Sequence, residues 1–323
     1  MAVVAVVSAA LVVVGAVLQG GGGTSQAASP PATRRPPVLD LGVLVAAGAD
    51  GPALAAAEQA WNAGKRSLAR RGFERLVRRD PAPLEAAVGA AVTAWPGGAL
   101  PRLERLAATH PASGLVRLNL GLALYANRDP AGARRQWRTA EARDPDSSAA
   151  VHAESLLHPE MAPGLPQFTP PVPLPREVAG LPPGRLLEAL RRRAEHDGPD
   201  AWLLAGAYLQ QVERPVSARA AFDRAVALAP HDLAALTAAA VGRFDKDNLG
   251  AAFSHLGPLT RRFPRSQIVR FYLGLLLAWT NQRGESLLQF KEAYELGPTT
   301  ELGRGAKAFV DRVGAGGTSG SKK

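Results

Sequence analysis

The chain has no cysteine and few aromatic residues, which make up 6% of its 323 residues. Without cysteine it can form neither a disulfide framework nor a thiolate metal site. A β-sandwich, which is built from many β-branched and aromatic residues, is also disfavoured. Hydrophobic residues nevertheless account for 46% of the chain, and alanine is abundant. This composition allows a sizeable core and is typical of closely packed helices.

Acidic residues are outnumbered by basic ones, 28 to 38, and the formal net charge is +10. Such a charge can indicate an anionic partner, such as nucleic acid or lipid head groups. It can also reflect a composition rich in arginine. The sequence does not interleave aromatic and basic residues in the way that stacks bases. It therefore favours the compositional explanation and predicts no nucleic-acid partner.

The first residues form a long uncharged run, Ala2–Leu18. As a helix this run would measure roughly 25 Å, slightly less than a hydrocarbon core of about 30 Å. We predict that residues 1–19 are a signal anchor that holds the protein in the cell membrane. The alternative is a signal peptide cleaved before Ala28, with Ser25 and Ala27 at the −3 and −1 positions, and a secreted protein. No basic residue precedes the run, so the usual orientation signal is missing.

Glycine and proline are concentrated next to this run, in Gly20–Gly23 and Ser29–Pro37. Such composition is typical of linkers, so we predict a flexible tether over residues 20–49. The chain also ends in a polar, glycine-rich stretch. We predict that residues 314–323 form a disordered tail.

Prolines recur with a period of 34 residues. Pro230, Pro264 and Pro298 are spaced in this way, and so are Pro111 and Pro145. Each proline closes an apolar pattern as long as a helix, as expected where a helix must stop. An internal repeat of this length is the signature of a solenoid built from helical hairpins.

Small and large residues also recur at fixed distances before these prolines. The matching sets are Ala140, Trp137, Ala133 and Gly121 before Pro145; Ala225, Phe222, Ala218 and Gly206 before Pro230; and Ala293, Phe290, Ser286 and Gly274 before Pro298. We expect the small residues to lie where the two helices of a hairpin cross. We expect each ring to fill the gap to the next repeat, because a single hairpin cannot bury its apolar face alone.

This pattern resembles the tetratricopeptide repeat (TPR), W-x-x-L-G…Y…A…F…A…P over 34 residues. The stretch Pro199–Asp232 is the most similar, and Gly114–Ser147 and Gln267–Thr300 match nearly as well. The resemblance covers about three-quarters of the chain. It implies an all-α solenoid of about six to seven helical hairpins and a protein or peptide partner.

The period breaks between Pro145 and Pro199. A first helix, Ser147–Leu157, and a second, Arg185–His196, flank an insertion with nine prolines over residues 158–184. We interpret this region as one repeat with an expanded turn. The alternative is a linker that separates two sub-domains. The remaining repeats then cover residues 50–157 and 185–300, and residues 301–313 form a capping helix that covers the last exposed face.

The insertion carries apolar residues among its prolines. They are Met161, Leu165, Phe168, Val172 and Leu174. An extended segment of this kind could lie along the groove of this chain or pack on its convex side. Deleting residues 163–183 should then increase the binding of an apolar dye.

In the family that the sequence resembles, the first helix of each repeat lines a concave groove that binds the partner. The residues that the resemblance places there are Leu118, Leu122, Tyr125, Leu203, Ala207, Gln210, Val241, Phe244, Phe271, Leu275 and Trp279. This lining is apolar and aromatic, and favours a partner with an apolar segment. Family members that bind a C-terminal carboxylate use Lys, Arg and Asn in the groove. Here Arg117 and Asn119 fall at positions that do not line it, so this function is not expected.

No catalytic motif is present: there is no phosphate-binding glycine loop, nucleophile elbow or zinc spacing, and the six histidines are scattered. We therefore predict no catalytic residue, no cofactor and no metal site, and a protein that is not an enzyme. Subtracting the repeats leaves no room for a second, catalytic domain.

The strongest charge feature is a cluster of arginines on the second helix of the first repeat. Its members are Arg70, Arg71, Arg75, Arg78 and Arg79. This helix could contact anionic lipid or an acidic partner, or it could simply be a solvated outer face.

These features together predict a membrane-tethered scaffold that recruits another protein, outside the cytoplasm of a bacterium. The bacterial assignment rests on the style of the sequence. The alternative is a permanent assembly or regulatory subunit of a bacterial envelope complex.

Overall fold

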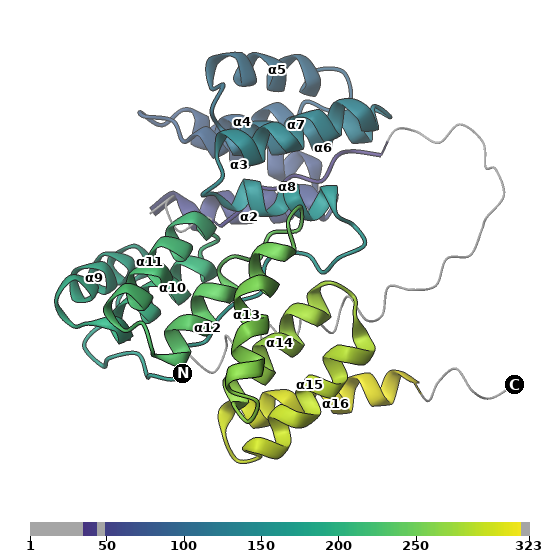
Figure 1. Ribbon diagram of the computed structural model, residues 1–323. Coiled ribbons are helices and arrows are strands. Elements are labelled where there is room, and N and C mark those ends of the chain that lie inside the picture. Colours follow the sequence, from purple (N-terminus) through teal and green to yellow (C-terminus); the bar gives the residue numbers. More distant parts are fainter. Residues whose placement is uncertain (1–34, 44–48, 318–323) are drawn as a thin grey trace, which may run out of the picture. The chain divides into compact units, whose positions relative to one another are not determined.

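The computed structural model describes residues 35–43 and 49–317. Every regular element of these residues is a helix (Figure 1), which confirms the predicted all-α fold. None of the helices in this part of the chain is long and apolar enough to cross a bilayer. The predicted anchor, residues 1–19, lies outside the described residues, and so do residues 20–34 and 44–48 of the predicted tether.

The described chain divides into two compact units at Leu157. The N-terminal unit, residues 35–157, contains α2 (Gly51–Asn62), α3 (Arg66–Val77), α4 (Leu84–Val92), α5 (Ala99–Thr109), α6 (Gly114–Ala126), α7 (Pro130–Arg143) and α8 (Ser148–Leu157). The C-terminal unit, residues 158–317, contains α9 (Pro183–His196), α10 (Pro199–Gln211), α11 (Pro215–Leu228), α12 (Leu233–Val241), α13 (Gly250–Arg262), α14 (Gln267–Trp279), α15 (Arg283–Leu296) and α16 (Glu301–Gly317). In each unit, consecutive helices pack as hairpins that lie side by side.

The turn inside a hairpin has the same conformation in four repeats. One residue in it has a positive φ: Gly64 (77°), Arg128 (68°), Glu213 (54°) and Asn281 (59°). This region of φ favours glycine and is costly for most other residues. The repeat therefore dictates the turn, even where the local residue is not glycine.

The recurring glycines make room for the recurring rings. A Cβ atom at Gly121 would lie 2.3 Å from Nε1 of Trp137, and one at Gly206 would lie 2.4 Å from Cε1 of Phe222. Each ring thus packs over the glycine of its own hairpin. Phe222 also reaches the next hairpin, where a Cβ at Gly242 would lie 2.8 Å from its ring. The expectation that the rings fill only the gap between repeats was therefore incomplete.

The region around the proline-rich insertion differs from our first interpretation. Helix α8 packs against α6 and α7, whereas α9 packs against α10. They belong to different units, so they do not form one repeat with an expanded turn. The division at Leu157 favours the alternative of two sub-domains. Helix α9 begins at Pro183, two residues before the predicted start at Arg185. Proline is well tolerated in the first turn of a helix, so Pro183 does not prevent this earlier start.

The C-terminal helix α16 packs against α15, as predicted for a cap. It runs to Gly317, so the predicted start of a disordered tail at residue 314 is wrong. Glycine only weakens a helix, and no proline stops this one.

Candidate functional site

An extended segment of the chain, residues 35–43, lies on the first helices of the N-terminal unit; we call it the N-terminal segment. The N–H of Leu39 donates to Oδ1 of Asn62 (3.0 Å), and Nδ2 of Asn62 donates to the carbonyl of Leu39 (2.8 Å). Asn119 binds Asp40 in the same way, at 3.0 and 2.6 Å. A carboxamide offers one acceptor and two donors, so it can pair with both backbone groups of an extended residue, as a neighbouring strand does.

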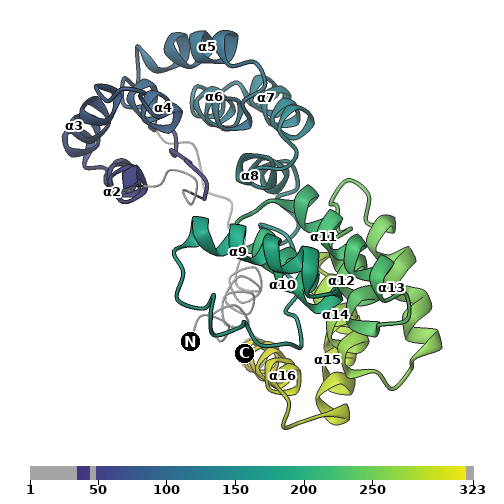
Figure 2. The same cartoon turned by 90° about the vertical axis from the view of Figure 1, so that its left-hand side faces the viewer.

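Further hydrogen bonds extend this contact along the N-terminal segment. The indole of Trp61 donates to the carbonyl of Pro37 (2.8 Å), and the N–H of Leu41 donates to Oε1 of Glu58 (2.7 Å). At the far end, the N–H of Val43 donates to Oγ of Ser148 (3.2 Å). The segment therefore crosses α2, α6 and α8, on the inner side of the arc that Figure 2 shows.

Two ionisable groups of α2 and α8 also face the N-terminal segment. Nδ1 of His152 lies 2.7 Å from the Asp40 carboxylate. Burial raises the pKa of Glu58 above its ordinary value, although the hydrogen bond from Leu41 acts against this rise. The Asp40 carboxylate and the Leu41 N–H of the segment are thus each paired with an ionisable side chain, His152 of α8 and Glu58 of α2.

Alternate side chains of the N-terminal segment are buried, as the twofold period of an extended chain requires. Pro37, Leu39 and Leu41 are buried, whereas Val38 is 61% exposed. The prediction of a flexible tether is therefore wrong for residues 35–43. The buried leucines and the amide contacts hold this part of the chain against the repeats.

The C-terminal unit binds a second extended segment, which is part of the proline-rich insertion. The N–H of Phe168 donates to Oε1 of Gln210 (2.8 Å), and Nε2 of Gln210 donates to the carbonyl of Pro166 (3.3 Å). The hydroxyl of Tyr272 accepts from the N–H of Thr169 (2.7 Å) and donates to its carbonyl (3.3 Å). The insertion therefore lies on α10 and α14, which are first helices of their hairpins.

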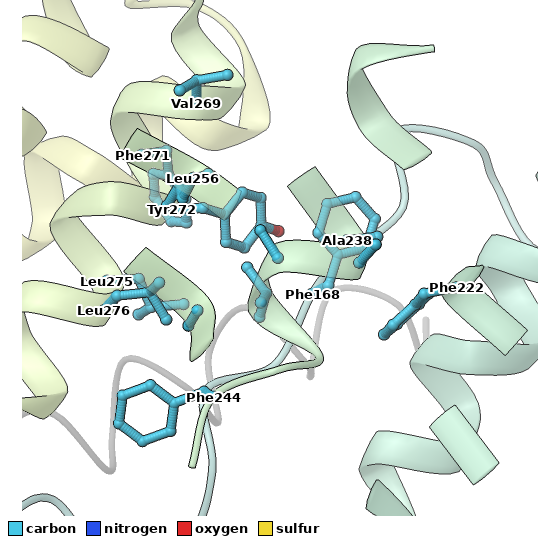
Figure 3. Packing of buried hydrophobic residues seen from close by; sticks show 14 of the residues in the cluster. Phe168, Phe222, Ala238, Phe244, Leu256, Val269, Phe271, Tyr272, Leu275 and Leu276 are labelled. Carbon is cyan, nitrogen blue, oxygen red and sulfur yellow. The ribbon is translucent and has the colours of Figure 1, made fainter. Parts of the chain in front are cut away.

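Phe168 is the side chain that the insertion buries most deeply, at 1% exposed. Its ring centroid lies 4.9 Å from that of Tyr272 and 5.8 Å from that of Phe222, the latter edge to face. Figure 3 shows the ring between these two neighbours. Such ring pairs contribute about 0.5–1.5 kcal/mol beyond the area that they bury. Of the two arrangements considered for the insertion, the structure has the one in which it lies in the groove.

An apolar cavity of about 130 Å³ lies beside Phe168. Its lining residues are Phe168, Thr169, Pro170, Val172 and Leu174 of the insertion, Leu186 and Leu190 of α9, and Leu204, Ala207, Tyr208 and Gln211 of α10. Burial raises the pKa of the Tyr208 phenol. The insertion thus covers the groove without filling it.

The predicted groove residues fall into two groups. Gln210, Ala207 and the carbonyl of Trp279, which accepts from the N–H of Ala162 (3.3 Å), contact the insertion or line the cavity. Of the other predicted residues, Leu118, Leu122 and Tyr125 pack beside α7. The remaining five belong to the apolar cluster that also contains Ala162 and Phe168 of the insertion; they are Leu203, Val241, Phe244, Phe271 and Leu275.

Gln210 is the one predicted groove residue whose side chain binds backbone atoms of an extended segment; the other side chains that do so were not among the predicted residues. Asn119 lines the groove, although it was assigned to a position that does not, and Tyr272, Asn62 and Glu58 were not considered. A signal was present: Asn119 and Tyr272 both lie 26 residues before the proline that closes their repeat. The predicted stripe began one residue earlier. The rejection of Arg117 was correct, since it bonds to Gln136 and to the carbonyl of Ala107.

Three members of the arginine cluster, Arg70, Arg71 and Arg75, lie on the exposed side of α3, whereas Arg78 caps the end of this helix and Arg79 follows it. All five side chains are exposed, Arg70 pairs with Glu74 at 2.7 Å, and Arg79 pairs with Asp50. Among the described residues, no three His, Asp or Glu side chains are placed to hold a metal ion.

The hairpins, their 34-residue spacing and the ring over each glycine agree with the TPR pattern in the sequence. The fold is of the tetratricopeptide type. No protein-family model and no curated protein matches this chain. Solved structures do resemble it. YrrB, a TPR protein with an unusual peptide-binding site, is 17% identical, with a TM-score of 0.31 over 64% of this chain and 97% of its own.

Two longer proteins also resemble this chain. The human IFIT1 dimer with PPP-AAAA is 15% identical, with a TM-score of 0.34 over 80% of this chain. Yeast Tom70 is 11% identical, with a TM-score of 0.35 over 94% of this chain. The chain spans only 62% and 54% of these two proteins.

We expect Tyr272 to make the groove of the C-terminal unit sensitive to alkaline pH. Burial raises the pKa of its phenol to about 12 from an ordinary value of 10.0. The unfolded chain loses this proton first, so the contribution to stability is complete below pH 10 and is lost as the pH rises to 12. We expect the wild-type protein to lose on the order of 2 kcal/mol more than Tyr272→Phe over this range. Urea denaturation of both proteins across the range measures this difference, and equal losses would contradict it.

Proposed function

We propose that this TPR chain is a non-catalytic protein-interaction scaffold whose first helices bind extended peptide segments. The supporting observation is that the protein already binds two extended segments of its own chain in this way. In both units, side chains of first helices bind the backbone N–H and C=O of an extended segment. Every peptide carries these groups, so they supply affinity, while pockets for alternate side chains supply specificity. An apolar partner segment suits the groove, because the buried side chains of both bound segments are apolar.

Photo-crosslinking in the native host tests this function. A photoreactive residue at Gln211, which lines the cavity, should capture a discrete partner protein. The matched control is a photoreactive residue at Arg224, which is exposed on the second helix α11. Equal cross-linking from the two positions would rule out the groove as the binding surface.

We also propose that residues 2–18 tether the scaffold to the membrane, with the repeats outside the cytoplasm. The uncharged run in the sequence supports this proposal. A cleaved, secreted protein is the alternative. Membrane fractionation of the full chain, together with protease treatment of sealed cells or vesicles, distinguishes the two. Recovery of the protein only in the soluble fraction, with a new N-terminus, would establish the alternative.

The exposed arginine cluster of α3 supports a further contact with anionic lipid. Each basic residue near such a surface contributes about 1 kcal/mol. We expect that changing Arg70, Arg71, Arg75 and Arg78 to Ser in a protein lacking residues 1–34 abolishes flotation with anionic vesicles. The matched control changes the exposed Arg134, Arg135, Arg138 and Arg143 of α7 to Ser. Equal recovery of the two variants would end the lipid proposal.

A further inference from the structure

We propose that the proline-rich insertion is an exchangeable internal ligand of the C-terminal unit. The partner that replaces it is an extended peptide with an aromatic side chain in the place of Phe168, followed by a bulky aliphatic side chain that fills the cavity. This inference rests on the proposed function and specifies its partner. It is carried by three observations: how the insertion is bound, what it leaves empty, and how it differs from the N-terminal segment.

The binding of the insertion separates general from specific contacts. Gln210 and Tyr272 bind only backbone atoms, which any extended peptide can supply. The site of Phe168 is different, because the rings of Phe222 and Tyr272 flank it and leave it 1% exposed. A planar ring gains offset or edge-to-face contacts there that an aliphatic side chain lacks. The groove therefore selects an aromatic residue in register with the two polar side chains.

Beyond Thr169 the insertion forms few hydrogen bonds with the groove and leaves part of it unfilled. Pro170, Pro171 and Pro173 have no N–H to donate, so this stretch can form few backbone hydrogen bonds. Val172 and Leu174 line the cavity but leave about 130 Å³ of apolar space beside them. Atoms that face a void lose the contacts that a filled core would give. A partner with a larger aliphatic side chain at this place would bind more tightly than the insertion does.

The N-terminal segment shows what a permanent occupant looks like in this chain. Asn62 and Asn119 bind consecutive residues, and Glu58, Trp61 and Ser148 bind backbone atoms on either side. Its polar contacts run from one end of the segment to the other. The insertion is longer, yet among the described residues its backbone is held to the first helices through Gln210, Tyr272 and the carbonyl of Trp279, so these bonds are more widely spaced and fewer of them must break for release.

The insertion has one advantage over a free peptide, because both of its ends are attached. Linking a segment in this way gives it an effective concentration on the order of 1 mM. An external peptide must compete with that concentration in the intact protein. Cutting the insertion at one end lowers it without removing any side chain. This provides a test that does not depend on a core substitution.

The probe for this test is a fluorescent peptide that copies residues 162–174 of the insertion. A protease site placed at the exposed Ala179–Gly180 in the full chain allows the insertion to be cut. We expect the cut protein to bind the probe at least ten-fold more tightly than the uncut protein. Phe168→Ala in the uncut protein should have the same effect, because it empties the ring site. Arg176→Ala, at an exposed position of the insertion, is the control and should bind like the wild type.

Two altered probes test the chemistry of the partner. A probe with Phe168→Ala should not bind the cut protein measurably. A probe with Val172→Leu adds one methylene group toward the cavity, worth about 0.8 kcal/mol, and should bind roughly four-fold more tightly. Equal binding of all three probes would overturn the proposed partner.

Failure of this inference can be distinguished from failure of the proposed function. If neither cutting nor Phe168→Ala increases probe binding, the insertion is a fixed part of the fold and exchange is refuted. Partner capture at Gln211 would still support the scaffold in that case. If the probe exchanges as expected but no partner is captured in the host, the groove is exchangeable and the scaffold function fails.

Discussion

Phe222→Ala should lower the free energy of unfolding of the C-terminal unit by about 3–5 kcal/mol. The ring is completely buried and packs over both Gly206 and Gly242. It also forms one wall of the site that holds Phe168. Removing it leaves a cavity that glycine cannot fill from either side, because glycine has no side chain that could move into the space. We therefore expect little relaxation and a loss near the upper end of this range.

Hydrogen exchange measures this loss separately in each unit. Amides of α10 and α12 should lose protection in Phe222→Ala, whereas those of α6 should keep theirs. Val216→Ala is the control, since this residue of α11 is 47% exposed and should change stability by less than about 0.5 kcal/mol. Similar losses in the two variants would show that the ring is not the centre of this core.

Changing both Asn62 and Asn119 to Ala should release the N-terminal segment from its groove. The two carboxamides bind both backbone groups of Leu39 and Asp40 through four hydrogen bonds. Each lost hydrogen bond costs about 0.5–1.5 kcal/mol. Exchange of the amides of Leu39 and Asp40 should therefore become at least ten-fold faster.

The double variant needs a control that preserves the segment. Asn127→Ala is suitable, because Asn127 caps α6 through its backbone N–H. None of the hydrogen bonds of the described residues joins Asn127 to the N-terminal segment. It should leave the exchange of Leu39 unchanged. Persistent protection of Leu39 in the double variant would mean that the buried leucines and the bonds to Trp61, Glu58 and Ser148 hold the segment without the two carboxamides.

The fold could be predicted from the sequence because its signal repeats. The prolines, the glycines and the rings recur every 34 residues, and each has a direct structural role. The groove residues were harder to find. One residue along a helix turns the side chain by about 100°, so an error of one position moves a stripe from the groove into the core. Leu118 and Phe271 were chosen in this way, whereas Asn119 and Tyr272, their immediate neighbours, bind the segments.

The occupation of the two grooves could not be deduced from local patterns. Asp40 and Asn119 are 79 residues apart, and Thr169 and Tyr272 are 103 apart. Proline and glycine in a segment predict that it is extended, but they do not predict what it binds. The composition of residues 35–43 was for this reason taken as a sign of flexibility. The sequence shows no clean alternation there, because the exposed Val38 is as apolar as the buried Pro37, Leu39 and Leu41.

The direction of the hydrogen bonds on the N-terminal segment has a mechanical consequence. These bonds join the segment to α2, α6 and α8, so they run across the segment and not along its length. A pull on the chain at residue 35, directed along the segment, would strain these bonds simultaneously, in shear. A pull away from the helices would break them one at a time, as in opening a zipper. The attachment should therefore resist tension along the chain far better than lifting from its surface.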